Sequence, residues 1–249
     1  MSFRNVKKFS ENNNYDAFAQ LYDELEIDIF SVLMADELVE FFQQKNVKWP
    51  GAFAKHLDLC CGTGSLCQIF AESGFETKGV DASAGMLALA REKCGSTDFV
   101  EADVLQYSDS VKYDIVTCID DAINHLGPFT VVQKFFERVA GLLRPGGYFV
   151  FDSITEEVLD LHKETIDRDG GIKLVFHTEK LGPDKVITEL NYFQNGKLLG
   201  KFANEEHFFP LDKLQQALAS AGFEVESCSR DFPPIDEEKK YKIFARKAT

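Results

Sequence analysis

The first part of the chain alternates short apolar runs with segments whose apolar residues recur every three or four positions. The first pattern predicts strands and the second predicts helices. The predicted strands cover residues 52–59, 75–81, 97–103, 113–120 and 148–154. The predicted helices between them cover residues 65–72, 83–94 and 130–143. Strands that alternate with helices of this length indicate a parallel sheet with helices on both faces, the doubly wound class.

The pattern is different at the start of the chain and after residue 154. Residues 15–44 have helical spacing and predict two helices. A helix is expected near residues 155–166, and three antiparallel strands over 171–181, 185–194 and 197–209. Asn195-Gly196 is a strong two-residue hairpin signal between the last two of these strands. A helix over 211–222 and strands over 223–230 and 239–247 then end the chain.

Together these elements predict one α/β core rather than two independent domains. The expected fold is a Rossmann-like, doubly wound sheet of seven strands with an N-terminal helical cap and an inserted antiparallel β meander. The cap is residues 1–50, the core is residues 51–154 and 210–249, and the insertion is residues 155–209.

Charge and composition narrow the classes of partner. The 249 residues carry a formal net charge of −14, whereas a surface that follows nucleic-acid phosphates needs Lys and Arg. Nucleic acid and anionic membrane are therefore disfavoured. The chain has no run of about 18 apolar residues and no signal-peptide pattern, so a cytoplasmic protein is expected. The six cysteines lie mostly in apolar segments, which predicts reduced thiols.

One short segment, LDLCCGTGS at residues 57–65, joins a predicted strand to a predicted helix. Gly62 and Gly64 expose backbone N–H groups and allow a ligand to approach where a Cβ would clash. The alternative is a tight turn that serves packing alone. Cys60, Cys61 and Cys67 lack the paired spacing of a zinc site, so no metal is expected.

Acidic residues end three successive predicted strands: Asp58, Asp81 and Asp103. A carboxylate at the end of the second strand can accept both hydroxyls of a ribose that lies across the first two strands. Asp81 could instead cap the next helix, although Ser83 competes for that role. Asp103 could likewise be a turn residue. Three such acids in a row are harder to attribute to capping alone.

Five segments, in this order and spacing, resemble the motif series of class I S-adenosylmethionine-dependent methyltransferases. They read LDLCCGTGS, GVDASAGMLALARE, VEADVLQY, YDIVTCIDDAINHL and LLRPGGYFVFD. The resemblance is close from Tyr15 to Asp152, and the order of elements extends it to the C-terminus. The insertion is similar to that of the small-molecule branch, which includes sugar-amine and glycine N-methyltransferases, and it would form a lid over the acceptor site.

The resemblance implies contacts with the expected cofactor, S-adenosyl-L-methionine. Asp58 and the backbone from Cys60 through Gly62 to Gly64 would meet its amino-acid portion, and Asp81 its ribose hydroxyls. The other implied contacts are Ala82 and Met86 beside the adenine, Asp103 and the Val104 N–H on the adenine edge, and Asp120 beside the methyl donor.

The segment YDAFAQLYDEL resembles the helix that closes over the cofactor in many relatives. Tyr15 and Tyr22 would then face inward, although ordinary packing of an amphipathic helix explains both tyrosines equally well. The sequence also departs from the family. Cys60 stands where Gly or Ala is usual, and His207 and Phe208 stand where relatives often carry Arg or Gln.

The expected reaction is direct in-line transfer of a methyl group to an N or O atom of a small-molecule acceptor, which requires alignment and exclusion of water. His125 is the candidate base, with a structural histidine as the alternative. Asp121 and Asn124 could orient the substrate or merely cap a turn. His177 and His207 could line the acceptor pocket or lie on the solvent face of the insertion.

Two other functions stay open from the residues alone. An NAD-dependent oxidoreductase would also use Gly62-x-Gly64 with Asp81, although Cys67 occupies the third position of that fingerprint. The second alternative is a catalytically inactive cofactor-binding module that acts through partners. The expected assembly is a monomer or a homodimer.

Overall fold

A computed structural model describes residues 15–23, 25, 27–44, 54–160, 164–230 and 240–249. The expected strands and helices of residues 54–154 are confirmed to within a few residues at their ends. The described residues contain no helix that is both long and apolar enough to cross a membrane.

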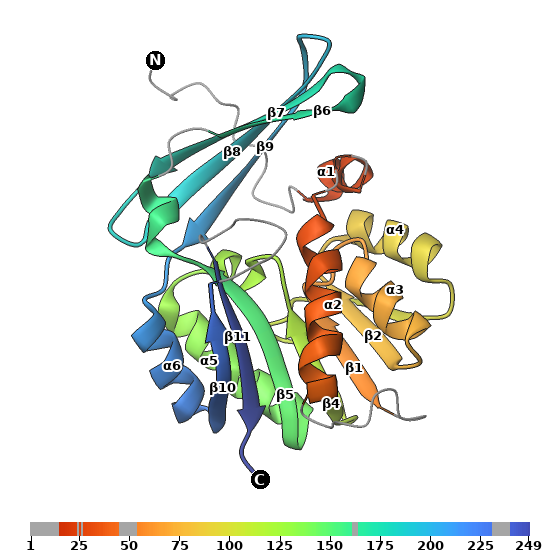
Figure 1. Cartoon of the computed structure of the whole chain (residues 1–249), viewed down its shortest axis with the longest axis vertical. Helices are drawn as coiled ribbons and strands as arrows, with labels where there is room; N and C mark the ends of the chain where they lie inside the picture. Colours follow the sequence, from red (N-terminus) through yellow and green to blue (C-terminus); the bar gives the residue numbers. More distant parts are fainter. Residues whose placement is uncertain (1–14, 24, 26, 45–53, 161–163, 231–239) are drawn as a thin grey trace.

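The larger sheet has seven strands in the order β10-β11-β5-β4-β1-β2-β3 (Figure 1). Its strands are β1 (Lys55–Leu59), β2 (Glu76–Asp81), β3 (Asp98–Glu101), β4 (Tyr113–Cys118), β5 (Leu143–Ile154), β10 (Phe223–Ser229) and β11 (Lys240–Lys247). Strand β11 is antiparallel to both of its neighbours, and the other pairs are parallel. The strand order reverses between β1 and β4, which in this class is where a ligand binds at the carboxyl ends.

Helices cover both faces of this sheet (Figure 1). They are α2 (Ile29–Gln44), α3 (Ser65–Glu72), α4 (Ala84–Cys94), α5 (Phe129–Leu142) and α6 (Leu211–Ser220). Strand β5 contributes side chains to the hydrophobic clusters on both faces of the sheet. Tyr148 and Val150 pack in the cluster that contains α2 and α3, whereas Phe149 and Phe151 pack in the cluster that contains α5 and α6. This two-residue alternation follows from the pleat of a strand that is buried on both faces.

The segment RPGG at residues 144–147, which precedes the predicted strand 148–154, lies within β5 as an irregularity. Tyr113 of β4 pairs with Leu143, and Ile115 pairs with Tyr148, so the pairing register shifts across the turn sequence. Gly146 has φ +74°, which a glycine adopts without steric cost.

The insertion forms a separate antiparallel sheet in the order β6-β7-β8-β9. Its strands are β6 (Glu164–Arg168), β7 (Ile172–Lys180), β8 (Lys185–Gln194) and β9 (Lys197–His207). The hairpin between β8 and β9 is confirmed, since Asn195 and Gly196 both have positive φ, 50° and 79°. The domain boundaries themselves stay a prediction.

The expected helix at residues 155–166 is wrong. The chain there makes a short 3-10 helix, η2 (Glu156–Asp160), and then β6, so the insertion has four strands rather than three. Thr165 pairs with Val175 and Ile166 pairs with Leu174 on β7. Pairing with the next strand, β7, overrides the weak local helical spacing, as strand propensity depends strongly on cross-strand neighbours.

The two expected N-terminal helices are confirmed as α1 (Tyr15–Tyr22) and α2. Helix α1 lies between the second sheet and α4 (Figure 1). On one side Phe18 stacks on Phe202 of β9, with ring centroids 4.5 Å apart. On the other side the Asp16 Oδ1 atom accepts hydrogen bonds from Ser83 Oγ (2.6 Å) and Gly85 N (2.8 Å) at the start of α4. Helix α1 therefore joins the second sheet to the carboxyl edge of the larger one.

Candidate active site

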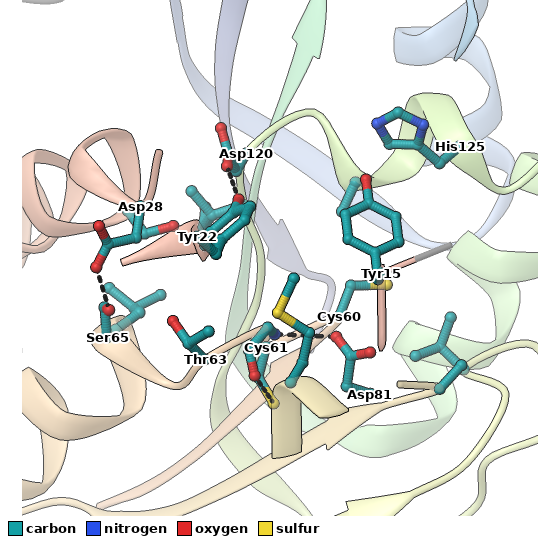
Figure 2. Close-up of a pocket in the computed structure, with 18 of the residues that line it drawn as sticks. Tyr15, Tyr22, Asp28, Cys60, Cys61, Thr63, Ser65, Asp81, Asp120 and His125 are labelled. Carbon is teal, nitrogen blue, oxygen red and sulfur yellow. Dashed lines mark hydrogen bonds between the residues drawn. The ribbon is translucent and has the colours of Figure 1, made fainter. Parts of the chain in front are cut away.

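A cavity of about 220 Å³ lies at the carboxyl ends of β1, β2 and β4, beside α1 (Figure 2). It brings together most of the residues expected from the sequence. These are Tyr15, Tyr22, Cys60, Gly62, Asp81, Ala82, Met86, Asp103, Val104, Asp120 and His125. Asp58 and Gly64 do not line it. We call this the first cavity.

Two glycines of the β1–α3 loop have different structural roles. Gly62 lines the first cavity, and a Cβ on it would meet nothing within 4 Å, so space is open in front of its backbone. A Cβ on Gly64 would lie 3.0 Å from the Ala90 Cβ and 3.2 Å from Phe99. Gly64 therefore permits close packing of the loop against α4 and β3, which is the alternative weighed for a glycine turn.

Cys60 adopts a left-handed backbone conformation, φ +59°, although it is not glycine. This conformation costs an L-residue about 1 to 2 kcal/mol, which explains why a glycine suits this position. The Cys60 thiol hydrogen-bonds to Cys118 of β4, and this bond, with burial, holds the pKa of Cys118 well above its ordinary value. The loop therefore accommodates the larger residue by contact with β4. All six cysteines are free thiols.

Asp81 faces the first cavity from the end of β2. Its Oδ2 accepts from Gly62 N at 2.9 Å and its Oδ1 from Ser83 N at 2.8 Å. Burial raises the pKa of Asp81, partly offset by these backbone donors. The N-cap of α4 is Ser83, whose Oγ accepts from Met86 N at 3.1 Å. Asp81 is thus not needed as the helix cap.

Asp58 is buried at the end of β1, 3% exposed. Thr117 Oγ1 donates to its Oδ1 at 2.6 Å, and Cys67 Sγ donates to its Oδ2 at 3.6 Å. Behind Thr117 lies the buried His56, with its Nε2 2.8 Å from Thr117 Oγ1. Burial raises the pKa of Asp58 to about 7, and the hydrogen bond from Thr117 opposes this rise. A cation placed at the loop would favour the ionised carboxylate.

Asp103 lines the first cavity and also stabilises the turn after β3. Its Oδ1 accepts from Leu105 N at 2.8 Å, and its Oδ2 accepts from the Gln106 side chain at 2.9 Å. The turn role considered for Asp103 is therefore present, together with its place in the cavity wall.

The N-terminal segment is tied to the glycine loop by polar contacts that the sequence did not reveal. Thr63 Oγ1 donates to Asp23 Oδ1 and Ser65 Oγ donates to Asp28 Oδ2, each at 2.5 Å (Figure 2 shows the second). Lys93 of α4 lies 2.7 Å from Asp23 and donates to Ser65 Oγ at 2.8 Å. Asp28, Ser31, Thr63 and Ser65 also line the first cavity. The residues that form these contacts are spread over about 70 positions of the sequence, so no short motif predicts them.

A second cavity, of about 310 Å³, lies between α1 and the second sheet. It shares four wall residues with the first: Tyr15, Tyr22, Asp120 and His125. Figure 2 shows Tyr22 pointing toward Asp120, to which its hydroxyl donates at 2.6 Å, and Tyr15 pointing toward His125. Burial and the charges of Asp120 and Asp121 hold the pKa of both tyrosines well above the ordinary value. Both tyrosines are therefore neutral at the junction of the two cavities, and the Tyr15 hydroxyl accepts from Asn204 Nδ2 at 2.8 Å.

Two successive aspartates at the end of β4 form an ionic cluster beside this junction. Asp120 and Asp121 both have left-handed backbones, φ +67° and +47°. Lys240 Nζ lies 3.2 Å from Asp120, 3.6 Å from Asp121 and 3.6 Å from the fully buried Asp152. Burial raises the pKa of Asp152 to about 7, against the opposing charge of Lys240. The ammonium of Lys240 is thus shared by three carboxylates.

Only some of the substrate residues expected from the sequence line a cavity. Asp121 and His125 line the second cavity. Asn124 is fully buried outside both cavities: its Nδ2 donates to Ser153 Oγ and the His207 carbonyl, and its Oδ1 accepts from Ile154 N. This side chain ties the loop after β4 to β5 and β9.

His177 and His207 lie on the second sheet but line neither cavity. On β7 the wall residues are Leu174 and Phe176, so His177 has the opposite face of the strand. On β9 the wall residues are Phe202, Asn204 and Glu206, which leaves His207 on the other face. Glu206 is a further cavity residue that was not predicted from the sequence, although the alternation of residues along the strand from Phe202 would have indicated it.

With this geometry described, comparison with known proteins is informative. Residues 57–147 match the methyltransferase domain family. A protein provisionally named as a methyltransferase in Geobacillus sp. (strain WCH70) is 29% identical over 250 residues, which cover 94% of this chain and 99% of that protein. The dTDP-3-amino-3,6-dideoxy-alpha-D-glucopyranose N,N-dimethyltransferase of Streptomyces fradiae is 28% identical over 188 residues, covering 70% of this chain and 71% of that enzyme.

A solved structure of a S-adenosylmethionine-dependent methyltransferase from Clostridium acetobutylicum superposes with a TM-score of 0.78 at 21% identity. The superposition covers 94% of this chain and 99% of that one, so the two share their fold over nearly the whole length. The matched domain also contains the loop and strand ends that wall the first cavity. Residues 57–147 therefore form a methyltransferase domain, and the chain shares its fold with a S-adenosylmethionine-dependent methyltransferase over nearly its whole length.

Proposed function

We propose that this enzyme transfers the methyl group by direct in-line displacement to an N or O atom of a small-molecule acceptor held in the second cavity. The observation that carries the proposal is the junction of the two cavities, which share Tyr15, Tyr22, Asp120 and His125. A donor bound in one cavity and an acceptor bound in the other would meet at these side chains. Alignment of this kind supplies much of the barrier reduction in a displacement reaction.

The residues around the first cavity fit the cofactor. The open space in front of Gly62 leaves room for a ligand against bare backbone, and the Asp81 carboxylate stands at the rim for ribose hydroxyls. Asp58 lies behind the loop, where its buried carboxylate would favour the cofactor's ammonium. The proposed wall of the adenine is formed by Ala82, Met86, Asp103 and Val104. The bound sulfonium would supply an electrophilic methyl group, which needs no covalent enzyme intermediate.

His125 is the proposed base for the acceptor proton. It lines both cavities, and its ring meets the edge of the Tyr15 ring with centroids 6.4 Å apart. Its Nδ1 lies 3.3 Å from the Glu205 carbonyl oxygen, which favours the tautomer with the proton on Nδ1. That tautomer leaves Nε2 free to accept a proton.

The dTDP-amino-sugar enzyme named above supports a small acceptor, since it is 28% identical to this chain over 188 residues. Six free thiols, three of them buried, support a reducing compartment such as the cytoplasm.

Labelled methyl transfer tests the acceptor class. The full chain is incubated with methyl-labelled S-adenosylmethionine and a cell extract, which is then separated by ultrafiltration. Label is expected in the low-mass filtrate. Label confined to retained protein or nucleic acid would contradict a small-molecule acceptor, and cofactor binding without any labelled product would favour the inactive module.

A further inference from the structure

The second cavity has an unequal distribution of charge and apolar surface. The end that adjoins the first cavity carries Asp120, Asp121, Glu206, His125 and Lys240. The remainder is largely apolar and aromatic, including Phe18, Leu25, Phe30, Leu174, Leu190 and Phe202. A ligand that fills it must therefore combine an apolar body with one polar group directed toward the methyl donor.

The polar end has an excess of negative charge. Lys240 is shared by Asp120, Asp121 and Asp152, and its Nζ also lies 4.1 Å from the centre of the Phe30 ring. That single ammonium is oriented to these three carboxylates at 3.2 to 3.6 Å. Glu206 adds a fourth carboxylate to the same end of the cavity.

Glu206 is a buried acid, 8% exposed, on the cavity face of β9. Burial and the charge of Asp121 raise the pKa of Glu206, while the charges of His125 and Lys240 and a hydrogen bond to Thr188 oppose the rise. Burying an ionised carboxylate is costly unless a cation or strong donors pair with it. A ligand cation in the cavity would meet this requirement.

We propose that the acceptor is a small amphipathic amine, whose ammonium binds beside Glu206 and Asp121 while its apolar body packs against the aromatic and aliphatic wall. This inference rests on the proposed function and specifies its substrate. Arg168 also lines the cavity, so an acceptor that carries an anionic group is the contrasting outcome that the test must distinguish.

The chemistry balances without a further reactant. The bound ammonium gives one proton to the imidazole of His125, which lines both cavities. The amine lone pair then forms the new N–C bond while the methyl carbon–sulfur bond breaks, and its electron pair stays on sulfur. S-adenosylmethionine would supply the methyl group and leave as a neutral thioether, and the product nitrogen would carry the positive charge as a methylammonium.

Calorimetry on the full chain, saturated with S-adenosylhomocysteine, tests the proposal with three probes of equal length: hexylamine, hexanol and hexanoate. Hexylamine is expected to bind most tightly. Glu206→Gln should weaken hexylamine binding at least about tenfold, the scale of a lost charged hydrogen bond, and leave hexanol unchanged. Glu205→Gln is the matched control, because its side chain is 57% exposed and ion-pairs with Lys185 away from the cavity.

The possible outcomes distinguish failure of the amine assignment from failure of the proposed function. Tighter binding of hexanoate or hexanol than of hexylamine, no binding of hexylamine, or equal losses in the two glutamine variants would overturn the amine assignment while S-adenosylhomocysteine still binds. Failure of the wild-type chain to bind S-adenosylhomocysteine would instead contradict the cofactor site on which the proposed function depends.

Discussion

The two cavities are built from different kinds of structure. The first is walled by loops at the carboxyl ends of parallel strands, where backbone groups of Cys60 to Gly62 and the carboxylate of Asp81 are presented. The second is walled by one face of an antiparallel sheet and by α1, so its character depends on which side chains of β7, β8 and β9 point inward. Under the proposed function, backbone shape carries recognition of the cofactor, whereas side chains of an added layer select the acceptor.

The largest effect is expected where the cavities meet. His125→Ala should lower the rate of methyl transfer by about 100-fold or more, since a positioned base contributes about 10² to 10⁴ in rate. Affinity for S-adenosylhomocysteine should change little. Single-turnover transfer of labelled methyl groups across pH 6 to 9 measures this, and wild-type rates throughout would remove His125 from the mechanism.

The two loop glycines offer a sharper contrast within the first cavity. Gly64→Ala should lower the free energy of unfolding by about 3 kcal/mol, because φ is +79° and the new Cβ would press on Ala90 at 3.0 Å. Gly62→Ala adds only backbone strain of about 1 kcal/mol, because its Cβ meets nothing. Urea unfolding measures both variants.

Titration with S-adenosylhomocysteine further distinguishes the two glycine variants. Gly62→Ala should weaken S-adenosylhomocysteine binding more than it weakens the fold, since its methyl group would occupy the open space at the loop. Equal unfolding losses in the two variants, with unchanged cofactor affinity in Gly62→Ala, would show that both glycines serve packing alone.

Asp81→Ala tests the ribose assignment. Removal of a carboxylate that accepts from Gly62 N and Ser83 N, and is proposed to bind two hydroxyls, should weaken cofactor binding by about 1 to 2 kcal/mol. Hexylamine binding in the second cavity should be unaffected in the cofactor-saturated variant. Asp103→Ala is a useful comparison, because Asp103 also holds its own turn. An unchanged affinity in Asp81→Ala means that the ribose lies elsewhere.

A further prediction concerns the pH dependence of stability. The pKa of Asp58 rises from 3.8 to about 7 on folding, so between about pH 4 and 7 the folded chain binds more protons than the unfolded chain. Stability should therefore fall as pH rises through this window. Asp152, with a pKa of about 7, contributes in the same direction. Asp58→Asn should remove part of the slope, by about 1 kcal/mol or more.

Bound ligands test which cavity is linked to this pH dependence of stability. S-adenosylhomocysteine should flatten the Asp58 part, because its ammonium would favour the ionised carboxylate, whereas hexylamine should leave that part unchanged. Thermal unfolding at a series of pH values measures each case, and an identical slope in wild type and Asp58→Asn would contradict the raised pKa.

Much of the core could be predicted because its signals are local. Residues 54–154 follow period-two and period-3.6 patterns, and Gly62, Asp81 and Ser83 sit where a strand meets a helix, so their spacing alone locates the first cavity. Asn195-Gly196 likewise specified its hairpin through the positive φ that both residues tolerate. The failure at residues 155–166 arose where β6 depends on pairing with β7.

The parallel core, the glycine loop and the acids at the strand ends follow from local sequence patterns, because each depends on neighbours a few positions away. Three features depend on tertiary packing: α1 joins the two sheets, Lys240 lies between three aspartates, and Glu206 rather than His207 faces the second cavity. The physical reason is that a strand presents alternate residues to opposite faces, and the face that becomes buried is chosen by what packs on it. In this chain that partner is α1, which lies more than 180 residues away along the sequence.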